Sequence, residues 1–409
     1  MRDLHPSGLQ RLQPVAETCV NWHEHARRLA AQVTHPASRW RAVVEEVPRH
    51  VFVPRWWSPS DAGSSGNGVT WELRDGPANA SLWLEVAYSD RSLVTQVGTS
   101  HADQAAGGDH PPGVPTSSST MPGLIVRLAQ HAYLADGTDV LDVGTGSGYG
   151  CALLAARLGG EHVTSVDVDP YLTAAAAERL DSVGLCPAVL TVDATNALRG
   201  TYDRIVATVA VRPVPASWLT ALRPRGRLVT TIAGTGLILT ADKTDDGGAL
   251  GQIEWDRAGF MLSRHGPGYP PPLWERNEAA RDGDGEQVTR GWYPVLNVME
   301  AWELWSMITV LVPGVEHYYW EEDGRRTAWM LHPDGSWARA SSVGSEAPVV
   351  HQSGARRLWD LLDEVREMWL RDGSLPVYGA SATITPDGGI HLRRGRWSAS
   401  LTRESHEAH

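Results

Sequence analysis

Short apolar runs separated by longer amphipathic stretches mark the central part of the chain. Residues 140–143 (VLDV) are typical of a buried strand, and a glycine-rich stretch at 144–148 (GTGSG) connects them to an apolar helix expected over 151–158. Three more apolar strands are expected at 162–169, 188–195 and 202–211. Strands that alternate with helices in this way predict a doubly wound α/β fold.

Acidic residues accompany all four of these strands. Asp142 lies just before the glycines, Asp167 and Asp193 lie at the ends of the second and third strands, and Asp203 lies near the start of the fourth. Ligands of doubly wound sheets bind in the crevice at the carboxyl ends of the strands. A carboxylate repels a phosphate but attracts a cation, so Asp142 favours a cationic ligand without phosphates.

Two cofactors are compatible with a glycine-rich turn at this place. A dinucleotide requires the spacing G-x-G-x-x-G, whereas the glycines here alternate from Gly144 onward. S-adenosylmethionine carries a sulfonium and an amino group, which suit the carboxylate of Asp142. We therefore expect S-adenosylmethionine rather than a nicotinamide cofactor. A plain tight turn in a domain without a nucleotide is the third possibility, and it does not explain the acidic residues.

The region before the glycine-rich stretch contains consecutive hydroxyl residues that include 117–120, just before a helix expected from residue 123. On the local pattern this run is an ordinary helix start, with Thr120 as the N-cap and Pro122 in the first turn. The functional alternative is that these hydroxyls contact a ligand.

Other expected elements are helices in 1–35 and 38–47, strands at 69–73 and 81–87, and flexible loops at 61–68 and 101–115.

The composition changes after residue 265. Residues 266–287 are rich in Pro, Gly and charge and are expected to form a linker. Beyond them, hairpins are expected at Asp323-Gly324, Asp334-Gly335 and 387–389, and an amphipathic helix at 355–373, which predicts a small α+β domain. The expected organisation is an N-terminal region that contributes to the substrate site (1–112), a cofactor-binding core (113–265), the linker (266–287) and a C-terminal α+β domain (288–409).

Charge and composition narrow the class of protein. The 409 residues carry a formal net charge of −12, which argues against nucleic acid and anionic membranes as partners. No apolar run approaches the length of a membrane span and the first residues do not resemble a signal peptide, so we expect a cytoplasmic protein. The three cysteines have neither a disulfide pattern nor zinc spacing, and no metal is expected.

Tryptophan is concentrated towards the C-terminal end of the chain. Eleven of the 18 tryptophans follow residue 250, and only two phenylalanines occur in the whole chain. Most of these tryptophans are expected to fill a core. Trp302, Trp305 and Trp320 are the candidates for a surface that docks a peptide.

The chain resembles protein L-isoaspartyl O-methyltransferases over residues of about 38–265. The matching pieces are HVFVP (50–54), AYSD (87–90), SSSTMP (117–122), VLDVGTGSGYG (140–150), SVDVD (165–169), YDRIVATVAV (202–211) and RPRGRLV (223–229). The resemblance implies a Rossmann-like class I methyltransferase fold, S-adenosyl-L-methionine as methyl donor and S-adenosyl-L-homocysteine as product.

The resemblance also implies roles for individual residues. Thr120 aligns with a hydroxyl that touches the substrate carboxylate, and Ser118 and Ser119 lie beside it. The implied cofactor contacts include the methionine end at Asp142, Gly144, Gly146 and Tyr149, the ribose at Asp167 and the adenine side at Asp193. The remaining expected cofactor contacts are Thr145, Ser147, Gly148, Val168, Ala194 and Thr208, and the expected substrate contacts are Val53, Val209, Ala210, Val211 and Arg212.

The chain departs from the family at residues 208–213 and 225–226 and by the addition of residues 266–409. Similar extended members look like those encoded with lanthipeptides and graspetides, which implies methylation of an aspartate in a modified precursor peptide, leading to aspartimide or isoaspartate. One alternative is a general repair enzyme that methylates isoaspartyl residues in damaged proteins. Another is a catalytically weak protein that binds the cofactor or escorts a peptide. The oligomeric state is not predicted.

The methyl transfer expected at this site requires few catalytic groups from the protein. A side-chain carboxylate is ionised and nucleophilic near neutral pH. Transfer of a methyl group from sulfonium to carboxylate cancels charge, so it needs neither a general base nor a metal. Alignment of the reactants and exclusion of water are sufficient, and alignment alone supplies a large part of the rate.

Overall fold

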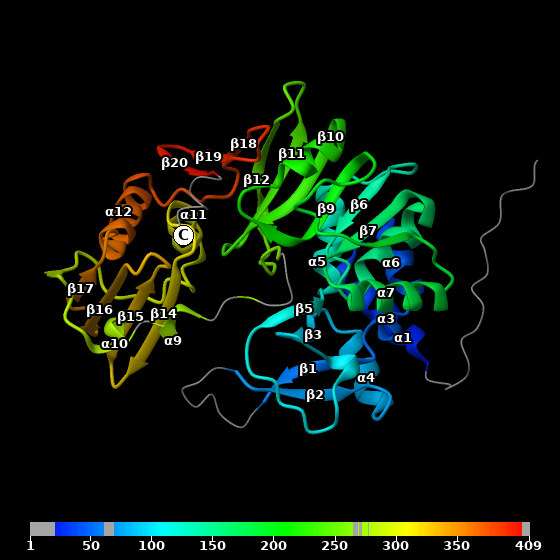
Figure 1. Ribbon diagram of the computed structural model, residues 1–409, viewed down its shortest axis with the longest axis horizontal. Helices are drawn as coiled ribbons and strands as arrows, with labels where there is room; N and C mark the ends of the chain where they lie inside the picture. Colours follow the sequence, from blue (N-terminus) through cyan, green and yellow to red (C-terminus); the bar gives the residue numbers. More distant parts are fainter. Residues whose placement is uncertain (1–20, 61–68, 265–268, 270–271, 277, 403–409) are drawn as a thin grey trace, which may run out of the picture. The chain divides into compact units, whose positions relative to one another are not determined.

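The computed structural model describes residues 21–60, 69–264, 269, 272–276 and 278–402 (Figure 1). The chain divides into two compact units, residues 1–193 and 194–409. The loop expected at 61–68 lies outside the described residues, as does most of the helix expected before residue 22.

The N-terminal half of the first unit combines short helices with a five-stranded sheet. The sheet has the order β2-β1-β3-β4, and β5 also pairs with β3. Trp57, Trp71, Val97 and Ala102 form a buried cluster on this sheet. The elements are α1 (Trp22–Val33), α2 (Trp40–Glu46), α3 (Arg49–Phe52), β1 (Arg55–Pro59), β2 (Trp71–Asp75), α4 (Ala80–Ala87), β3 (Leu93–Val97), β4 (Ser100–His101), η1 (Ala102–Gln104) and β5 (Pro115–Ser119).

The strand expected at 81–87 is wrong, because this segment forms helix α4. The side chain of Asn79 caps the helix by accepting a hydrogen bond from the amide of Leu82 at 3.2 Å. Leu84 and Ala87 are the buried positions, and a spacing of three residues places both on one face of a helix. The cap residue before an apolar run was the signal that the strand assignment overlooked.

The second half of the first unit follows the expected alternation of strands and helices. Strands β6, β7 and β8 are parallel, with Asp142 opposite Ser165 and Val166 opposite Leu190. Helix α6 packs against β7, and α7 packs against β7 and β8. The elements are α5 (Pro122–His131), β6 (Val140–Val143), α6 (Tyr149–Leu158), η2 (Gly160–His162), β7 (Val163–Asp167), α7 (Pro170–Ser182) and β8 (Ala188–Thr191).

The second unit contains a sheet built from two distant parts of the chain. Strand β9 (Tyr202–Val211) pairs in parallel with β10 (Leu222–Ile232), and α8 (Ala216–Ala221) connects them. Strands β11 (Leu237–Lys243) and β12 (Ala249–Arg257) continue the sheet antiparallel. Strand β18 (Ser381–Ile384) then pairs with β12, and β19 (Ile390–Arg394) and β20 (Trp397–Leu401) follow.

A second antiparallel sheet in this unit has the order β13-β17-β16-β15-β14 (Figure 1). The hairpins expected at Asp323-Gly324, Asp334-Gly335 and 387–389 are confirmed, and the expected amphipathic helix is α12. Helices α11 and α12 pack against each other, and α12 packs on β16 and β17. The elements are β13 (Gln287–Arg290), α11 (Trp302–Leu311), β14 (Glu316–Glu322), β15 (Arg325–Leu331), β16 (Trp337–Val343), β17 (Val349–Ser353) and α12 (Leu358–Arg371).

The observed division differs from the expected domain boundaries. The stretch expected as a linker contains helices α9 (Leu273–Arg276) and α10 (Ala279–Asp282), and Ala280 packs into a buried cluster with Leu331 and Trp337. The end of the chain is split between two sheets, because β18–β20 extend the sheet of β9–β12. Residues 288–409 therefore do not form a layer of their own.

Most of the late tryptophans are buried or half-buried, as expected. Trp337, Trp359 and Trp397 are buried, whereas Trp320 is 63% exposed. Trp302 is half-buried and stacks on Tyr378 with ring centroids 4.2 Å apart. Trp255 and Trp292, which the sequence did not single out, are also exposed.

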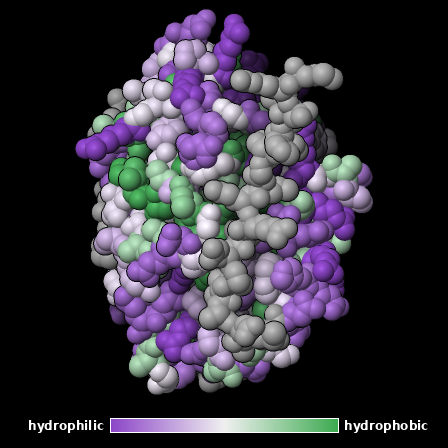
Figure 2. Space-filling view, turned by 90° about the vertical axis from the view of Figure 1, so that its right-hand side faces the viewer, coloured by the Kyte–Doolittle hydropathy of each residue, from purple (hydrophilic) through white to green (hydrophobic). Residues whose placement is uncertain are grey.

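The surface view in Figure 2 shows one face of the molecule that is largely hydrophilic, with apolar side chains gathered at the upper left. Among the described residues, no helix has the length and apolar character that crossing a membrane requires. Likewise, no group of three or more His, Cys, Asp or Glu side chains in the described part of the chain could hold a metal ion.

Candidate active site

The glycine-rich turn at 144–148 has the conformation that its glycines allow. Gly144, Gly146 and Gly148 have φ values of 99°, 50° and 89°, in the left-handed region that other residues avoid. A Cβ atom on Gly148 would lie 2.9 Å from the Cβ of Ala176 in α7. The strand, turn and helix expected from the sequence are confirmed, and the first turn of α6 opens at the end of β6.

Asp142 is buried inside strand β6, with 3% of its surface exposed. The Ser165 hydroxyl donates a hydrogen bond of 2.7 Å to its carboxylate, and the Thr145 hydroxyl lies 2.7 Å from the same Ser165 oxygen. The pKa of Asp142 is raised to about 7, chiefly by burial; the Ser165 hydrogen bond lowers it and the like charge of Asp167 adds to the increase. A bound cation would relieve the cost of this buried charge.

Asp167 ties the glycine-rich turn to the end of β7. Its carboxylate accepts hydrogen bonds from the amide of Gly146 at 3.0 Å and from the amide of Asp169 at 3.1 Å. Asp142 and Asp167 therefore flank the turn from two adjacent parallel strands.

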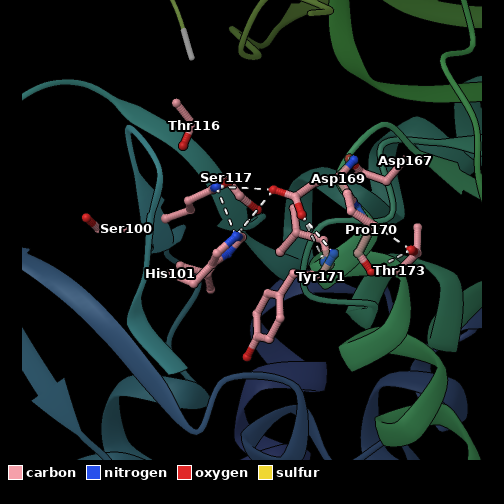
Figure 3. A network of polar contacts seen from close by, with 12 residues as sticks. Ser100, His101, Thr116, Ser117, Asp167, Asp169, Pro170, Tyr171 and Thr173 are labelled. Atoms are coloured by element: carbon pink, nitrogen blue, oxygen red, sulfur yellow. Dashed lines mark hydrogen bonds and ion pairs between the residues drawn. The ribbon is translucent and has the colours of Figure 1, made fainter. Parts of the chain in front are cut away.

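Asp169 connects this cofactor side to the N-terminal sheet (Figure 3). One carboxylate oxygen caps helix α7 by accepting hydrogen bonds from the amides of Tyr171 (2.9 Å) and Leu172 (3.3 Å). The other oxygen accepts a hydrogen bond from the Gln96 amide at 3.2 Å and lies 3.3 Å from Nε2 of His101. Asp169 thus holds the ends of β3 and β4 against the N-terminus of α7.

The segment expected as a flexible loop from residue 101 is ordered by further contacts with α7. Asp103 forms an ion pair of 2.5 Å with Arg179 and accepts a hydrogen bond of 3.2 Å from the Tyr171 hydroxyl. The rings of His101 and Tyr171 lie 4.3 Å apart. No local sequence pattern predicts these contacts, because each joins residues about 70 positions apart.

The hydroxyl residues at 117–119 end strand β5, and Thr120 follows the strand; we call residues 117–120 the acceptor segment. A Cβ atom on Gly146 would lie 3.2 Å from the carbonyl oxygen of Ser118 and 3.6 Å from the hydroxyl of Ser117. The acceptor segment therefore lies against the glycine-rich turn and leaves little room for a side chain at Gly146.

The expectation that Thr120 caps helix α5 is wrong. The N-cap position is Met121, which makes no side-chain cap. The helix start is held from another segment instead: the amide of Met121 donates to the Ser92 hydroxyl (3.1 Å) and the amide of Gly123 donates to the Asp90 carboxylate (2.7 Å). The hydroxyl of Thr120 is thus not used as a helix cap.

Two buried hydroxyls in this region have no hydrogen-bond partner among the described residues, those of Ser119 and Tyr149. Each of the two residues is only 1% exposed. A buried hydroxyl without a partner costs free energy that a bound ligand can recover. Both residues belong to segments for which the sequence predicted ligand contacts.

The remaining predicted site residues lie in different surroundings. The side chain of Val53 is fully buried, and its carbonyl accepts a hydrogen bond of 2.8 Å from the indole of Trp83. Ser147 is buried, whereas Val168 and Asp193 are half-buried. The second unit contains Ala194, Thr208, Val209, Ala210, Val211 and Arg212.

In the second unit, the predicted substrate residues lie at the end of β9. The amide and carbonyl of Ala210 bond to Met261 (2.8 Å) and Ser263 (2.9 Å). Burial lowers the pKa of Arg212, and its Nε atom is buried without a hydrogen-bond partner among the described residues.

Comparison with known proteins identifies the family. Residues 87–255 match the family described as Protein-L-isoaspartate(D-aspartate) O-methyltransferase (PCMT). A protein-L-isoaspartate O-methyltransferase from Aeropyrum pernix is 30% identical over 247 residues, which are 59% of this chain and 77% of the relative. The chain belongs to the protein-L-isoaspartate O-methyltransferase family.

Other relatives have the same name. The protein-L-isoaspartate O-methyltransferase of Ignicoccus hospitalis is 35% identical over 115 residues, which are 27% of this chain and about half (54%) of that relative. A solved Plasmodium falciparum structure of this kind, in complex with S-adenosyl-L-homocysteine, is 13% identical, covers 60% of this chain and 100% of that one, and has a TM-score of 0.41.

The protein is a methyltransferase of the S-adenosylmethionine-dependent class, and its residues fit this cofactor. The fit rests on the buried carboxyl of Asp142, whose pKa is raised to about 7 and which a cation would stabilise. It rests also on the three left-handed glycines beside it and on the hydroxyl of Tyr149, which has no hydrogen-bond partner within the described part of the chain. The expected class I α/β architecture agrees with the family.

Proposed function

We propose that this protein methylates the side-chain carboxylate of isoaspartyl residues in polypeptides, using S-adenosylmethionine. The observation that carries the proposal is the acceptor segment lying directly on the glycine-rich turn, with the Ser118 carbonyl 3.2 Å from where a Gly146 Cβ would be. The family and the named relatives support this general activity more directly than a dedicated natural-product activity.

Within this proposal, the cofactor contributes an electrophilic methyl group when it is bound. The turn at 144–148 and Asp142 would hold its methionine end, Asp167 its ribose and Asp193 its adenine side. The hydroxyls of Thr120 and Ser119 donate hydrogen bonds to the acceptor carboxylate and fix its direction. Hydroxyl donors orient a carboxylate without removing its charge, so the carboxylate remains nucleophilic.

The substrate should be recognised by its carboxylate rather than by a proton transfer. A carboxyl group is ionised near neutral pH, so no residue has to remove a proton before methyl transfer. The product is a neutral ester, which loses the charge-assisted hydrogen bonds that held the substrate. This loss favours release of the product.

A pair of synthetic peptides tests the proposal. The two peptides have the same sequence and differ at one position, aspartyl in one and isoaspartyl in the other. With methyl-labelled S-adenosylmethionine we expect base-labile label on the isoaspartyl peptide at a rate at least tenfold above that of the aspartyl peptide. Labelling of neither peptide, with cofactor binding intact by calorimetry, would contradict the proposal.

A second candidate function is methylation of an aspartate in a dedicated, ribosomally made peptide. One observation favours it: the family match ends at residue 255, whereas β13–β20 add a second sheet and three strands beyond that point. A ring-constrained peptide containing one aspartate distinguishes the two candidates. Faster methylation of the ring-constrained peptide than of the linear isoaspartyl peptide would favour the dedicated activity, and the reverse order would favour the general one.

A further inference from the structure

Arg49 occupies an unusual position in the first unit. It is the first residue of α3 and none of its surface is exposed. Its guanidinium donates hydrogen bonds to five backbone carbonyls and, among the described residues, to no carboxylate. The carbonyls belong to Ala87 (2.8 Å), Ser89 (2.8 Å), Arg91 (2.8 Å), Ser119 (3.3 Å) and Thr120 (3.2 Å).

These carbonyls come from two segments that are far apart in sequence. Three of them belong to the last residue of helix α4 and to the segment that follows it, and the other two belong to the acceptor segment. The same two segments are joined again where Ser92 and Asp90 accept the amides of Met121 and Gly123. A Cβ on Gly123 would lie 2.6 Å from an Asp90 carboxylate oxygen, so a side chain at this position would displace the Asp90 carboxylate.

Arg49 also reaches the cofactor side of the site. Its guanidinium carbon lies 5.4 Å from the centre of the Tyr149 ring, at the start of α6. This is within the range of a cation–π contact. One side chain therefore contacts both the acceptor segment and the first residue after the glycine-rich turn.

Removing the charge of an arginine from water costs free energy, so the burial of Arg49 calls for a structural explanation. Burial lowers the pKa of Arg49 to about 10, with Tyr149 and Asp90 opposing the shift, so the guanidinium remains charged near neutral pH. The planar fork of arginine offers five donors in fixed directions, whereas the ammonium of lysine offers three and cannot span the same carbonyls. An apolar residue could fill the space but could not hold two backbone segments in register.

We propose that Arg49 is the positioning residue of the acceptor segment: it fixes the backbone of Ser119 and Thr120 so that their hydroxyls meet the acceptor carboxylate in line with the cofactor. It acts through the backbone of these residues and touches neither substrate nor cofactor. The inference rests on the proposed function for its kinetic test, and a second measurement without any substrate keeps the two separate.

The experiment compares Arg49→Lys with Arg55→Lys in the full chain. Arg55 is a matched control, because its guanidinium also bonds to backbone carbonyls, those of Asp103 and Ala105, and to the Asp75 carboxylate, but not to the acceptor segment. We expect Arg49→Lys to lower kcat for the isoaspartyl peptide at least tenfold, with the Kd of S-adenosylhomocysteine changed less than threefold. Arg55→Lys should leave both within threefold.

Hydrogen exchange of the free protein gives a readout that a general loss of stability would not produce. In Arg49→Lys we expect the amides of residues 117–121 to exchange at least tenfold faster while those of β6 and β7 are unchanged. A uniform increase in exchange, or an unchanged kcat, would overturn the inference. A wild-type protein that methylates neither peptide would overturn the proposed function instead, and the exchange result would still decide the role of Arg49.

A milder variant covers the case in which Arg49→Lys does not fold. Ser92 is exposed, and among the described residues its side chain accepts a single hydrogen bond, from the amide of Met121, so Ser92→Ala removes one link between the same two segments. We expect this variant to lower kcat about threefold without changing the Kd of S-adenosylhomocysteine. An unchanged kcat in Ser92→Ala would count against the idea that bonds between these two segments position the acceptor hydroxyls.

Discussion

Asp142 has its carboxyl group inside a strand, where most proteins place an apolar side chain. Its neighbours on the strand are fully buried or nearly so, and its hydrogen-bond partner is a serine on β7. The sequence predicted that Asp142 lies at the ligand site and favours a cationic ligand, because an acidic residue before a glycine-rich turn is a local pattern. It did not reveal the depth of burial, which depends on how β7 and α6 cover β6.

The raised pKa of Asp142 predicts how cofactor affinity depends on pH. In the free protein the pKa is about 7, and the sulfonium favours the ionised carboxylate, so affinity is lost as pH falls below 7. We expect the Kd of S-adenosylmethionine, measured by calorimetry, to rise up to about tenfold per pH unit below 7 and to level off above it. In Asp142→Asn this slope should disappear; a slope that persists would assign the effect to another group.

The same pKa predicts an effect on the stability of the free protein. Between pH 4 and 7 the folded chain keeps the Asp142 proton while the unfolded chain has lost it, so this carboxyl makes stability fall as pH rises through that window. Asp142→Asn should therefore raise the Tm of the free protein at pH 8 by about 3 °C or more. Scanning calorimetry at pH 4 and pH 8 measures it, and an equal gain at both pH values would contradict the explanation.

The acceptor hydroxyls predict a separation of binding from catalysis. Thr120→Ala removes a donor to an ionised carboxylate, an interaction worth about 1.5–3 kcal/mol, so kcat/KM for the isoaspartyl peptide should fall about tenfold or more. The Kd of S-adenosylhomocysteine should be unchanged, because the hydroxyl does not belong to the cofactor turn. An equal loss of peptide turnover and cofactor binding in Thr120→Ala would remove Thr120 from its proposed role.

At the scale of elements, the site is a junction between strand β5, the turn after β6 and the start of α7. The sequence predicted the turn and the strands around it, because their periodicity is local. It missed helix α4 and the ordered hairpin of β3 and β4, because both depend on a cap or a distant partner. Asp169 joins these elements, and only the structure shows its partners Gln96 and His101.

Asp169 performs two tasks that substitution can separate. Asparagine is as good an N-cap as aspartate, so Asp169→Asn should keep α7 capped and lose only the charge facing His101. Asp169→Ala loses both, and we expect it to lower the free energy of unfolding by about 1 kcal/mol more than Asp169→Asn. Denaturant unfolding followed by circular dichroism measures the difference, and equal losses would mean that the cap contributes little.

At the scale of the whole chain, the strands at 381–401 extend the strands that the second unit begins at residue 202. Hydrophobic pattern and turn residues predicted the hairpin of these strands but not the sheet that they join, because the pattern of a strand does not specify a distant partner. Ala382, Ile384, Ile390 and Leu392 of these strands are buried. Their apolar side chains belong to the core of the second unit.

This arrangement predicts the result of truncation. A chain ending at residue 265 would expose the edge of β12 and the apolar surface that β18 covers, and exposed edges of this kind associate with one another. We expect the truncated protein to elute as aggregates in size-exclusion chromatography, whereas a chain ending at 402 elutes as the full-length protein does. A soluble, folded and active 1–265 fragment would show that the last strands are dispensable.

The pairing of β12 with β18 also has a consequence for synthesis in the cell. Strand β12 ends at residue 257 and its partner begins at residue 381, so at usual translation speeds the ribosome needs on the order of ten seconds to deliver the missing strand. During that interval the nascent polypeptide carries an open β-edge that a neighbouring nascent chain or a chaperone can bind. Slowing or hastening elongation between these two points should therefore alter the yield of native protein without altering a single amino acid.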